Sequence, residues 1–266
     1  MAGRVNVTAK SGGGLRSIVQ RLIENLSQTS EEGDSKVVLL RQLRSSNNWT
    51  ALRACERLKA MGVLEDGTLR DVNLTGANLS GADLFRANLG QTKFQDATLD
   101  EANLQEARMS GIDLLGASLI RANLFRADLS SANLFRTKLL EANLQESFLF
   151  QVDLRGADLK GAALRGARLS SSHLDGAAIS ISQLVHVGML SGSIMADGTR
   201  YDGRFNLAGD IQFAQFLDME LDINSPAAMA EFYDVPLNDY MRGQAWAQNY
   251  LHKFRAAAEE SESIPY

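Results

Sequence analysis

The fold of this chain is decided by a stretch in its middle, "LTGANLSGADLFRANLGQTKFQDATLDEANLQEARMSGID", which covers residues 74–113. A large apolar residue returns at every fifth position. Continued from Leu74 to Leu174, these positions hold leucine at 19 of 21 places, and Phe94 and Met109 fill the other two. A small or β-branched residue stands two places before each of them. The stretch therefore has a strict period of five residues.

A period of five fits neither a helix nor a straight strand. Successive residues of an α-helix are rotated by about 100°, so positions five apart would spread over every face of the helix. In a straight strand, positions five apart point to opposite faces. A chain that turns by about a quarter circle every five residues keeps all of the leucines inside. The pattern is typical of solenoids, whose repeats bury apolar surface by stacking on their neighbours.

The charges predict how many repeats make one coil. At a spacing of twenty residues, two outward columns alternate in sign, and they are Arg86–Glu106–Arg126–Glu146 and Glu101–Arg121–Glu141. Residues stacked at strand spacing lie about 4.8 Å apart, where like charges repel and opposite charges attract. Alternating signs are favourable only if residues twenty apart stand directly above one another. Four repeats of five therefore make one coil, and the two columns are structural charge ladders.

The repeated pattern A(N/D)LXX resembles the pentapeptide-repeat family. The resemblance covers about residues 67–184 and implies a right-handed quadrilateral β-helix. It also implies that the central leucine or phenylalanine and the small residue two places before it point inward. The other three positions of each repeat are then expected to face solvent. The expected fold is mainly β, a solenoid of about twenty residues per coil with a helical N-terminal cap and a C-terminal α+β or helical module.

The flanking sequences predict further segments. We expect a flexible N-terminus at residues 1–14, a helical cap at 15–64, the β-helix at 65–184, a hairpin with a helical module at 185–258 and a disordered tail at 259–266. The stretch "SIMADGTRYDGRF" at 193–205 holds two Asp-Gly turns and predicts the hairpin. In the stretch "NSPAAMAEFYDV" at 224–235, Ser225 is the expected N-cap and Pro226 the expected first helical residue.

Composition narrows the class of protein. The formal net charge is −5, which is mild and not typical of a nucleic-acid binder. Residues 1–64 hold 10 Lys or Arg against 5 Asp or Glu, residues 65–184 hold 12 against 15, and residues 185–266 hold 5 against 12. The one cysteine, Cys55, permits no intramolecular disulfide and fits a reducing compartment. No stretch reads as a signal peptide or a membrane span. The sequence predicts a cytoplasmic protein without membrane contact.

Catalytic and metal-binding patterns are not found. The histidines His173, His186 and His252 have no acidic or cysteine partner at motif spacing. Cys55 is expected to be a packing residue. The carboxylates Asp197, Asp202 and Asp210 do not have the spacing of a calcium loop and are expected in turns. We therefore expect no catalytic residue, no cofactor and no metal.

Large apolar residues at outward positions are the candidate site. They follow the central residue of their repeats, where many repeats carry a polar residue, and they are Phe85, Leu115, Ile120, Phe125, Phe135, Leu140 and Phe150. Five of them fall within residues 115–140, so we expect them together on stacked coils. Trp246 and Tyr250 form a second candidate surface on the last helix. These residues are expected to bind a protein partner or a second copy, to lie under the chain's own terminal segments, or to have no role.

Three functions remain open. The first is a non-enzymatic scaffold that binds a protein partner or itself through the outward apolar residues or the C-terminal helices. The second follows from the resemblance, because some members of the family mimic duplex DNA and bind type II topoisomerases. Mimicry needs a continuous negative surface, and arginines are scattered along this solenoid. The third is an enzyme whose activity lies in the C-terminal module. The first is the main prediction, and nucleic acid is not expected as a partner.

Overall fold

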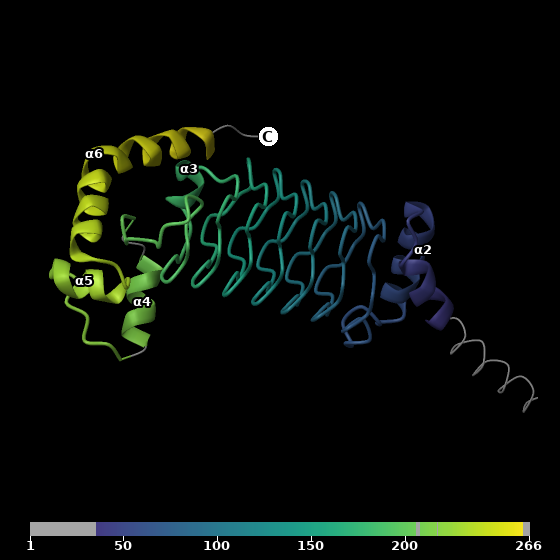
Figure 1. The fold of residues 1–266 in the computed structure, drawn as a ribbon. Helices are drawn as coiled ribbons and strands as arrows, with labels where there is room; N and C mark the ends of the chain where they lie inside the picture. The colour runs from purple at the N-terminus through teal and green to yellow at the C-terminus, as the bar shows by residue number, and fades with distance from the viewer. Residues whose placement is uncertain (1–35, 206–207, 217, 263–266) are drawn as a thin grey trace, which may run out of the picture.

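The computed structural model describes residues 36–205, 208–216 and 218–262. They form a column of stacked coils with helices at both of its ends (Figure 1). The segment at 1–14, the first part of the cap and the last four residues of the tail lie outside the described residues. The domain boundaries given above therefore remain predictions, although the course of the chain between them can be followed.

The coils are stacked in a register of twenty residues. Parallel bridges join residues twenty apart from Asn73–Lys93 through Asn103–Asn123 to Asp158–Ala178. The predicted coil of four repeats is thereby confirmed. Each repeat contributes one bridging residue rather than a continuous strand, because the chain turns again after three residues. The sides of the column thus pair like parallel β-strands, but each side is too short to form a continuous strand.

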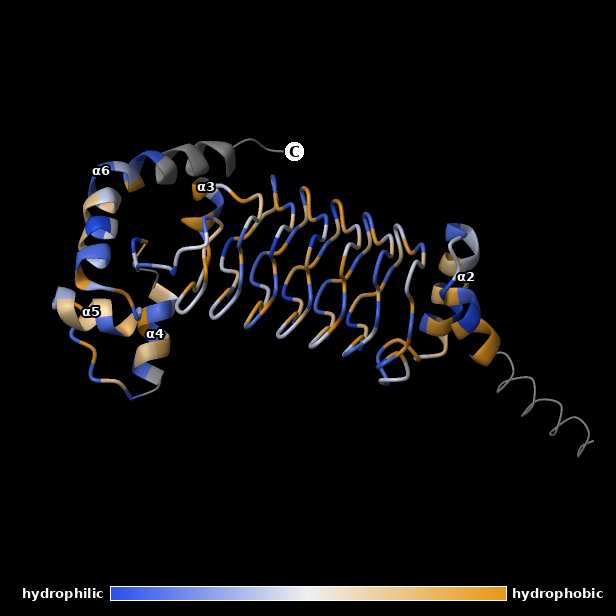
Figure 2. Cartoon of the chain, in the orientation of Figure 1, coloured by the Kyte–Doolittle hydropathy of each residue, from blue (hydrophilic) through white to orange (hydrophobic). Residues whose placement is uncertain are grey.

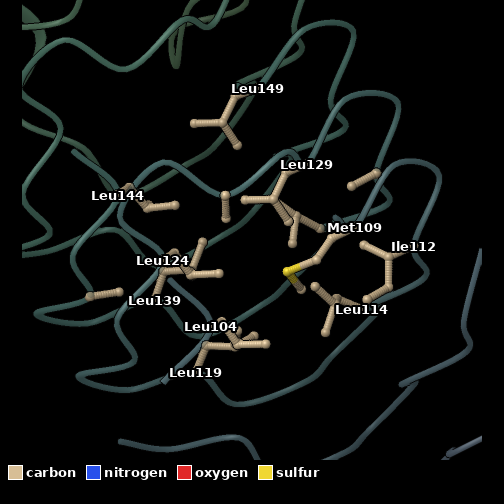
Figure 3. Packing of buried hydrophobic residues seen from close by; sticks show 14 of the residues in the cluster. Leu104, Met109, Ile112, Leu114, Leu119, Leu124, Leu129, Leu139, Leu144 and Leu149 are labelled. Carbon is tan, nitrogen blue, oxygen red and sulfur yellow. The ribbon is translucent and has the colours of Figure 1, made fainter. Parts of the chain in front are cut away.

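The interior of the column is filled by the repeated apolar residues. Leu124 and Ala122 are 1% and 0% exposed, and the equivalent residues of the other coils are buried with them. Leucines of successive coils lie inside the column one above another, as Leu104, Leu124 and Leu144 do in Figure 3. The predicted inward positions are confirmed. Stacking buries a continuous apolar core that no single coil could form.

Polar residues at inward positions make hydrogen bonds to the backbone. The hydroxyl groups of Thr92 and Thr137 donate to the carbonyl oxygens of Leu69 and Leu114 at 2.6 and 2.9 Å. Both residues are fully buried. Each hydroxyl has an acceptor inside the column. A threonine can therefore replace the small inward residue without leaving a buried polar group unsatisfied.

The asparagine or aspartate before each central residue stabilises the turn that follows. Its side-chain oxygen accepts the backbone N–H two residues later, for example from Phe125 to Asn123 at 3.2 Å. Asparagine side chains of neighbouring coils also form hydrogen bonds with each other, for example from Asn143 Nδ2 to Asn123 Oδ1 at 3.1 Å. The side chain satisfies an amide that the coil itself leaves without a partner. This explains why Asn and Asp are the commonest residues at this place.

The second residue after each central residue adopts a left-handed backbone conformation. Its φ is +56° at Arg126 and +59° at Ser131, and in other coils the position holds glycine, as at Gly111 with φ +67°. The charged residues of both predicted ladders occupy this position. A residue with a side chain is disfavoured in this conformation. Each turn of the column therefore contains one strained residue or a glycine.

The N-terminal end of the column is covered by helical residues 36–43 and by α2 (Asn48–Ala60). Backbone N–H groups of the first coil find acceptors in this segment, from Asn78 to the carbonyl oxygen of Ser45 and from Asn88 to that of Leu64. Cys55 of α2 is buried against the first coil. The cap thus pairs groups that an open end would leave free to bind another chain.

The coil register changes once near the C-terminal end. The short helix α3 (Ile181–Leu184) leaves the column after the sixth coil, and the parallel bridges then resume at a spacing of 21 residues. They join Arg168 to Met189 and His173 to Ile194. The ladder thus continues beyond residue 184, where the sequence pattern fades. Ile194 also pairs in antiparallel fashion with Arg200, inside the stretch predicted to form a hairpin.

Three helices complete the C-terminal module. They are α4 (Ala208–Phe216), α5 (Pro226–Phe232) and α6 (Leu237–Glu262). The Ser225 side chain caps α5 and Pro226 is its first residue, as predicted. Helix α6 packs on α5, then bends and passes over α3 (Figure 1). None of the described helices is long and apolar enough to cross a membrane.

Aromatic rings join the module into one core. Tyr201 lies edge-on to Tyr233 at 5.3 Å and stacks with Phe205 at 5.8 Å. A side chain at Gly203 would collide with the ring of Tyr233, so glycine is required there. Both tyrosines are fully buried. The module therefore has an aromatic core, and the backbone N–H of Tyr201 joins it to the last coil by donating to the carbonyl oxygen of Ser193.

The three aspartates predicted in turns divide into two cases. Asp197 and Asp202 accept the backbone N–H groups of Thr199 and Arg204, so both lie in turns as expected. For Asp210 the prediction is wrong. It lies in the first turn of α4, where it is fully buried and accepts backbone N–H groups of the last coil.

Candidate interaction surface

The register places the outward apolar residues in the turns between the sides of the column. Leu115 and Phe135 are twenty residues apart and share one edge of the column. Ile120 and Leu140 share the next edge. The side between these two edges carries Lys138 at its outward position. We call Leu115, Ile120, Phe135 and Leu140 the mid-column patch, since they lie in consecutive coils around one side.

The remaining three outward residues lie on other edges. Phe85 and Phe125 share the edge after that of Ile120, with one coil between them, and Phe150 lies on the fourth edge. The five residues expected together thus extend over three successive edges. No single side of the column carries all of them. Figure 2 shows hydrophobic and hydrophilic residues alternating around the coils, so no coil is apolar throughout.

Most of the outward rings are partly covered by arginines. The guanidinium groups of Arg86, Arg126 and Arg136 each lie 4.9 Å from the ring centre of the phenylalanine that precedes them. Phe135 also meets Arg155 at 5.7 Å. Such contacts stabilise by about 0.5–1 kcal/mol at exposed sites. Leu115 and Phe150 have no such cover and are 37% and 42% exposed.

The predicted charge columns contain ion pairs between neighbouring coils. Arg86 pairs with Glu106 at 2.7 Å and Arg126 with Glu146 at 2.6 Å, and Arg121 pairs with Glu101. The hydrogen bond from Arg86 holds the pKa of Glu106 below its ordinary value. Among the described residues Glu141 forms no ion pair. Signs alternate along these columns, so neither of them forms a continuous negative stripe.

The comparisons with known proteins agree with this geometry. Residues 68–100, 97–136, 132–170 and 149–180 match the model of pentapeptide repeats, in eight copies. The chain belongs to the pentapeptide repeat family. No curated protein matches it.

Solved structures of other pentapeptide repeat proteins resemble the chain. HetL from Nostoc sp. strain PCC 7120, involved in heterocyst differentiation regulation, is 34% identical over 54% of this chain and 79% of its own, with a TM-score of 0.30. Rfr23 from Cyanothece 51142 is 27% identical over 37% of this chain and 84% of its own, with a TM-score of 0.33. A protein from the Arabidopsis thaliana thylakoid lumen is 23% identical over 50% of this chain and 86% of its own, with a TM-score of 0.22.

The rim of the mid-column patch in this pentapeptide repeat protein is positively charged at two places. Arg136 stacks on Phe135, and Lys138 is exposed on the side between the two edges. Neither forms an ion pair among the described residues, whereas Arg155 nearby is paired with Asp153 at 2.7 Å. An apolar patch with unpaired cations at its rim is suited to a partner with apolar and acidic groups.

The second candidate surface, Trp246 and Tyr250 on α6, is only half exposed. Their rings stack at 5.8 Å. Trp246 is partly buried, where it meets Phe205 edge-on at 6.1 Å and Arg204 at 5.5 Å. Tyr250 is 45% exposed and lies 5.3 Å from the ammonium group of Lys253. Trp246 thus serves the core of the module, and only Tyr250 offers an open surface.

The titratable groups singled out in the sequence are dispersed. Burial raises the pKa of the Cys55 thiol to about 12, so it stays protonated and unreactive near neutral pH. His173 is exposed, and its Nδ1 atom lies 3.9 Å from Oδ2 of Asp175. The Nε2 atom of His186 is buried without a partner. No three His, Cys, Asp or Glu residues of the described chain are grouped to hold a metal.

One exposed residue was missed by the sequence analysis. Phe148 stands where most repeats carry Asn or Asp, and it is 40% exposed. Together with Phe150 it flanks the buried Leu149. The sequence does signal it, because a phenylalanine side chain cannot accept the hydrogen bond that asparagine accepts there from the backbone N–H two residues later. The other outward apolar residues all stand after a central residue, whereas Phe148 stands before one.

Proposed function

We propose that this chain is a non-enzymatic interaction protein that binds a protein partner or a second copy through the mid-column patch. The observation that supports this is the placement of four large apolar residues on two adjacent edges of consecutive coils. The fold does not need them there, since the same positions carry Gln95, Asp100, Arg155 and Lys160 in other coils. The described helices lie at the ends of the column, and none of them lies along its middle coils (Figure 1).

The size of the patch is adequate for a contact of useful strength. Burying a large apolar side chain contributes about 1.5–3 kcal/mol before the costs of association. Arg136 and Lys138 would add selectivity for an acidic partner. Mimicry of duplex DNA is less well supported, because arginines interrupt each charge column. A cytoplasmic location remains a prediction from the single cysteine.

The experiment replaces Phe135 and Leu140 together by serine. Because both side chains point outward, we expect the thermal unfolding temperature to change little. Binding should weaken by at least tenfold, which corresponds to about 1.4 kcal/mol. Sedimentation velocity measures self-association, and quantitative affinity capture from the native cell measures partner binding. Phe85→Ser, an outward ring on another edge, is the matched control.

Three outcomes are distinguishable. Loss of binding with intact folding in the double variant, and normal binding in Phe85→Ser, supports the proposal. A double variant that keeps its partners and its association state places the binding surface elsewhere and overturns it. A double variant that unfolds shows that the two side chains are packed inside the folded molecule, which also overturns it.

A further inference from the structure

A second exposed surface lies on another side of the column, at its C-terminal end. Phe148, Arg168 and Met189 stand above one another in successive coils, joined by parallel bridges. Arg168 and Met189 then line a groove of about 500 Å³ between the last coils and α4, where Gln212 and Phe213 form the opposite wall. We call Arg168, Met189, Gln212 and Phe213 the end groove, and Phe148 lies beside it against Arg168.

The floor of the end groove is glycine backbone. A side chain on Gly188 would lie 2.9 Å from the carbonyl oxygen of Gly166, and one on Gly209 would collide with the carbonyl oxygen of Gly188. Neither Gly188 nor Gly209 has a positive φ. Glycine is therefore needed at both places to let backbone segments approach closely, not to adopt a left-handed conformation. Three backbone segments therefore meet closely beside the groove, and their glycines add no side chains to its lining.

Arg168 gives the groove its charge. Its guanidinium group lies 4.9 Å from the ring centre of Phe148, and it forms no ion pair among the described residues. The two carboxylates that flank Phe148 in the preceding coil are engaged elsewhere, since Glu146 pairs with Arg126 and Asp153 with Arg155. Asp210 is buried, and one of its oxygens is occupied by two backbone N–H groups. An exposed guanidinium group is thus held in place by a ring, and no described residue gives it a counter-charge.

We propose that the end groove binds a short segment of a partner protein that carries an acidic side chain next to an aromatic or aliphatic one. Arg168 would bind the carboxylate through two parallel hydrogen bonds, a geometry for which arginine is suited. The neighbouring apolar side chain would pack on Phe213 and Met189. The exposed fractions of Phe148 and Phe213, 40% and 36%, leave area for this contact. The site is separate from the mid-column patch and does not depend on it.

The test uses a library of random dodecapeptides displayed on phage and selected on the full chain. We expect enrichment of sequences with Asp or Glu within two residues of an apolar residue. A selected peptide, labelled with fluorescein, is then titrated in fluorescence polarisation. Arg168→Gln and Phe213→Ser should each weaken its binding by at least tenfold. Arg155→Gln, whose arginine is paired and lies on another side, should bind as the unchanged protein does.

Charge reversal sharpens the result. Arg168→Glu should select basic rather than acidic residues beside the apolar one. The proposal is overturned if no peptide is enriched, if the enriched peptides lack acidic residues, or if Arg168→Gln and Phe213→Ser bind the peptide normally. A single-stranded oligonucleotide that displaces the peptide and binds more tightly would assign the groove to nucleic acid and also overturn the proposal. Results with Phe135→Ser and Leu140→Ser do not affect this test.

Discussion

The side chain of Asp210 accepts a hydrogen bond from the backbone N–H of Leu190 at 3.0 Å, and the same oxygen accepts the N–H of Ser191 at 2.9 Å. In earlier coils the N–H of the central residue is bound by a backbone carbonyl of the next coil, as from Leu169 to Met189. Asp210 lies twenty residues after Leu190 and replaces that carbonyl with a carboxylate. The ladder is therefore ended by a side chain rather than by another coil.

Asp210→Ala should destabilise the C-terminal end of the column. Two backbone N–H groups would lose their acceptor in a buried place, which costs about 1–3 kcal/mol. Asp210→Asn keeps an oxygen acceptor and removes a buried charge, so it should be at least as stable as the unchanged protein at pH 7. Thermal unfolding followed by circular dichroism measures both variants. Equal stability of the alanine variant would show that the carboxylate is not needed to end the ladder.

The stability of the protein should depend on pH through the same residue. Burial raises the pKa of Asp210 above its ordinary value of 3.8, and its second oxygen has no hydrogen-bond partner. The folded protein therefore holds the proton more tightly than the unfolded chain. This contribution to stability is fully present below the ordinary value and is lost as the pH rises through the raised pKa. As the pH rises from below 3.8 through the raised pKa, the unchanged protein should thus lose stability relative to Asp210→Asn. A difference in stability between the two proteins that stays constant with pH would contradict the expectation.

The alternation of charge along the column should be measurable in stability. Arg126 is paired with Glu146 and lies one coil from Glu106, so Arg126→Glu would place three acids in a row. We expect a loss of about 1–2 kcal/mol as two attractions become repulsions. Arg126→Gln is the control, since it removes the attraction without adding repulsion. Urea unfolding gives the free energy of each variant.

A compensating variant separates the charge pattern from local damage. Reversing all four members of the column, Arg86, Glu106, Arg126 and Glu146, restores alternation with opposite signs. Most of the stability that Arg126→Glu loses should return in this fourfold variant. The recovery should be smaller at high salt, because salt screens exposed ion pairs. If the fourfold variant is no more stable than Arg126→Glu, the ladder does not contribute through its signs.

Much of the column could be predicted from sequence because its information is local and repeated. The period of five fixes which residues are inside, and the reversal of sign between Glu106 and Arg126 fixes the coil length. Both depend on residues at constant spacing. The cap of α5 was also predictable, since Ser225 and Pro226 lie next to the helix that they begin.

The ends of the column could not be predicted because their contacts have no constant spacing. The insertion of α3 changes the register from 20 to 21 residues, and after it the apolar period is lost. The sequence predicts a turn at Asp210, since nothing near this residue indicates that its partners are Leu190 and Ser191. Likewise, the stacking of Arg136 on Phe135 depends on the turn geometry that brings adjacent side chains together.

The interior should tolerate neither smaller nor larger side chains. Leu124 is 1% exposed between the leucines of neighbouring coils, so Leu124→Ala should cost about 2–5 kcal/mol. Ala122 is fully buried, and Ala122→Leu should also destabilise because the added volume has no space. Equilibrium unfolding in urea measures both. Normal stability in both variants would contradict the inward placement of these residues.

The left-handed turn position should prefer glycine. Ser131 has a φ of +59°, a conformation that costs a residue with a side chain about 1–2 kcal/mol relative to glycine. Ser131→Gly should therefore stabilise by up to about 1 kcal/mol, since part of the gain is offset by the greater freedom of glycine in the unfolded chain. Ser131→Val should destabilise, because a β-branched residue is least tolerated in this conformation.

The neighbouring Ser130 provides the control for this comparison. It lies in the same turn, and its φ is not positive. Ser130→Gly should therefore destabilise or have no effect, because glycine gains nothing there and loses more entropy on folding. Thermal unfolding of the three variants gives an order, with Ser131→Gly most stable and Ser131→Val least. If glycine stabilises equally at 130 and 131, its effect does not come from the left-handed backbone.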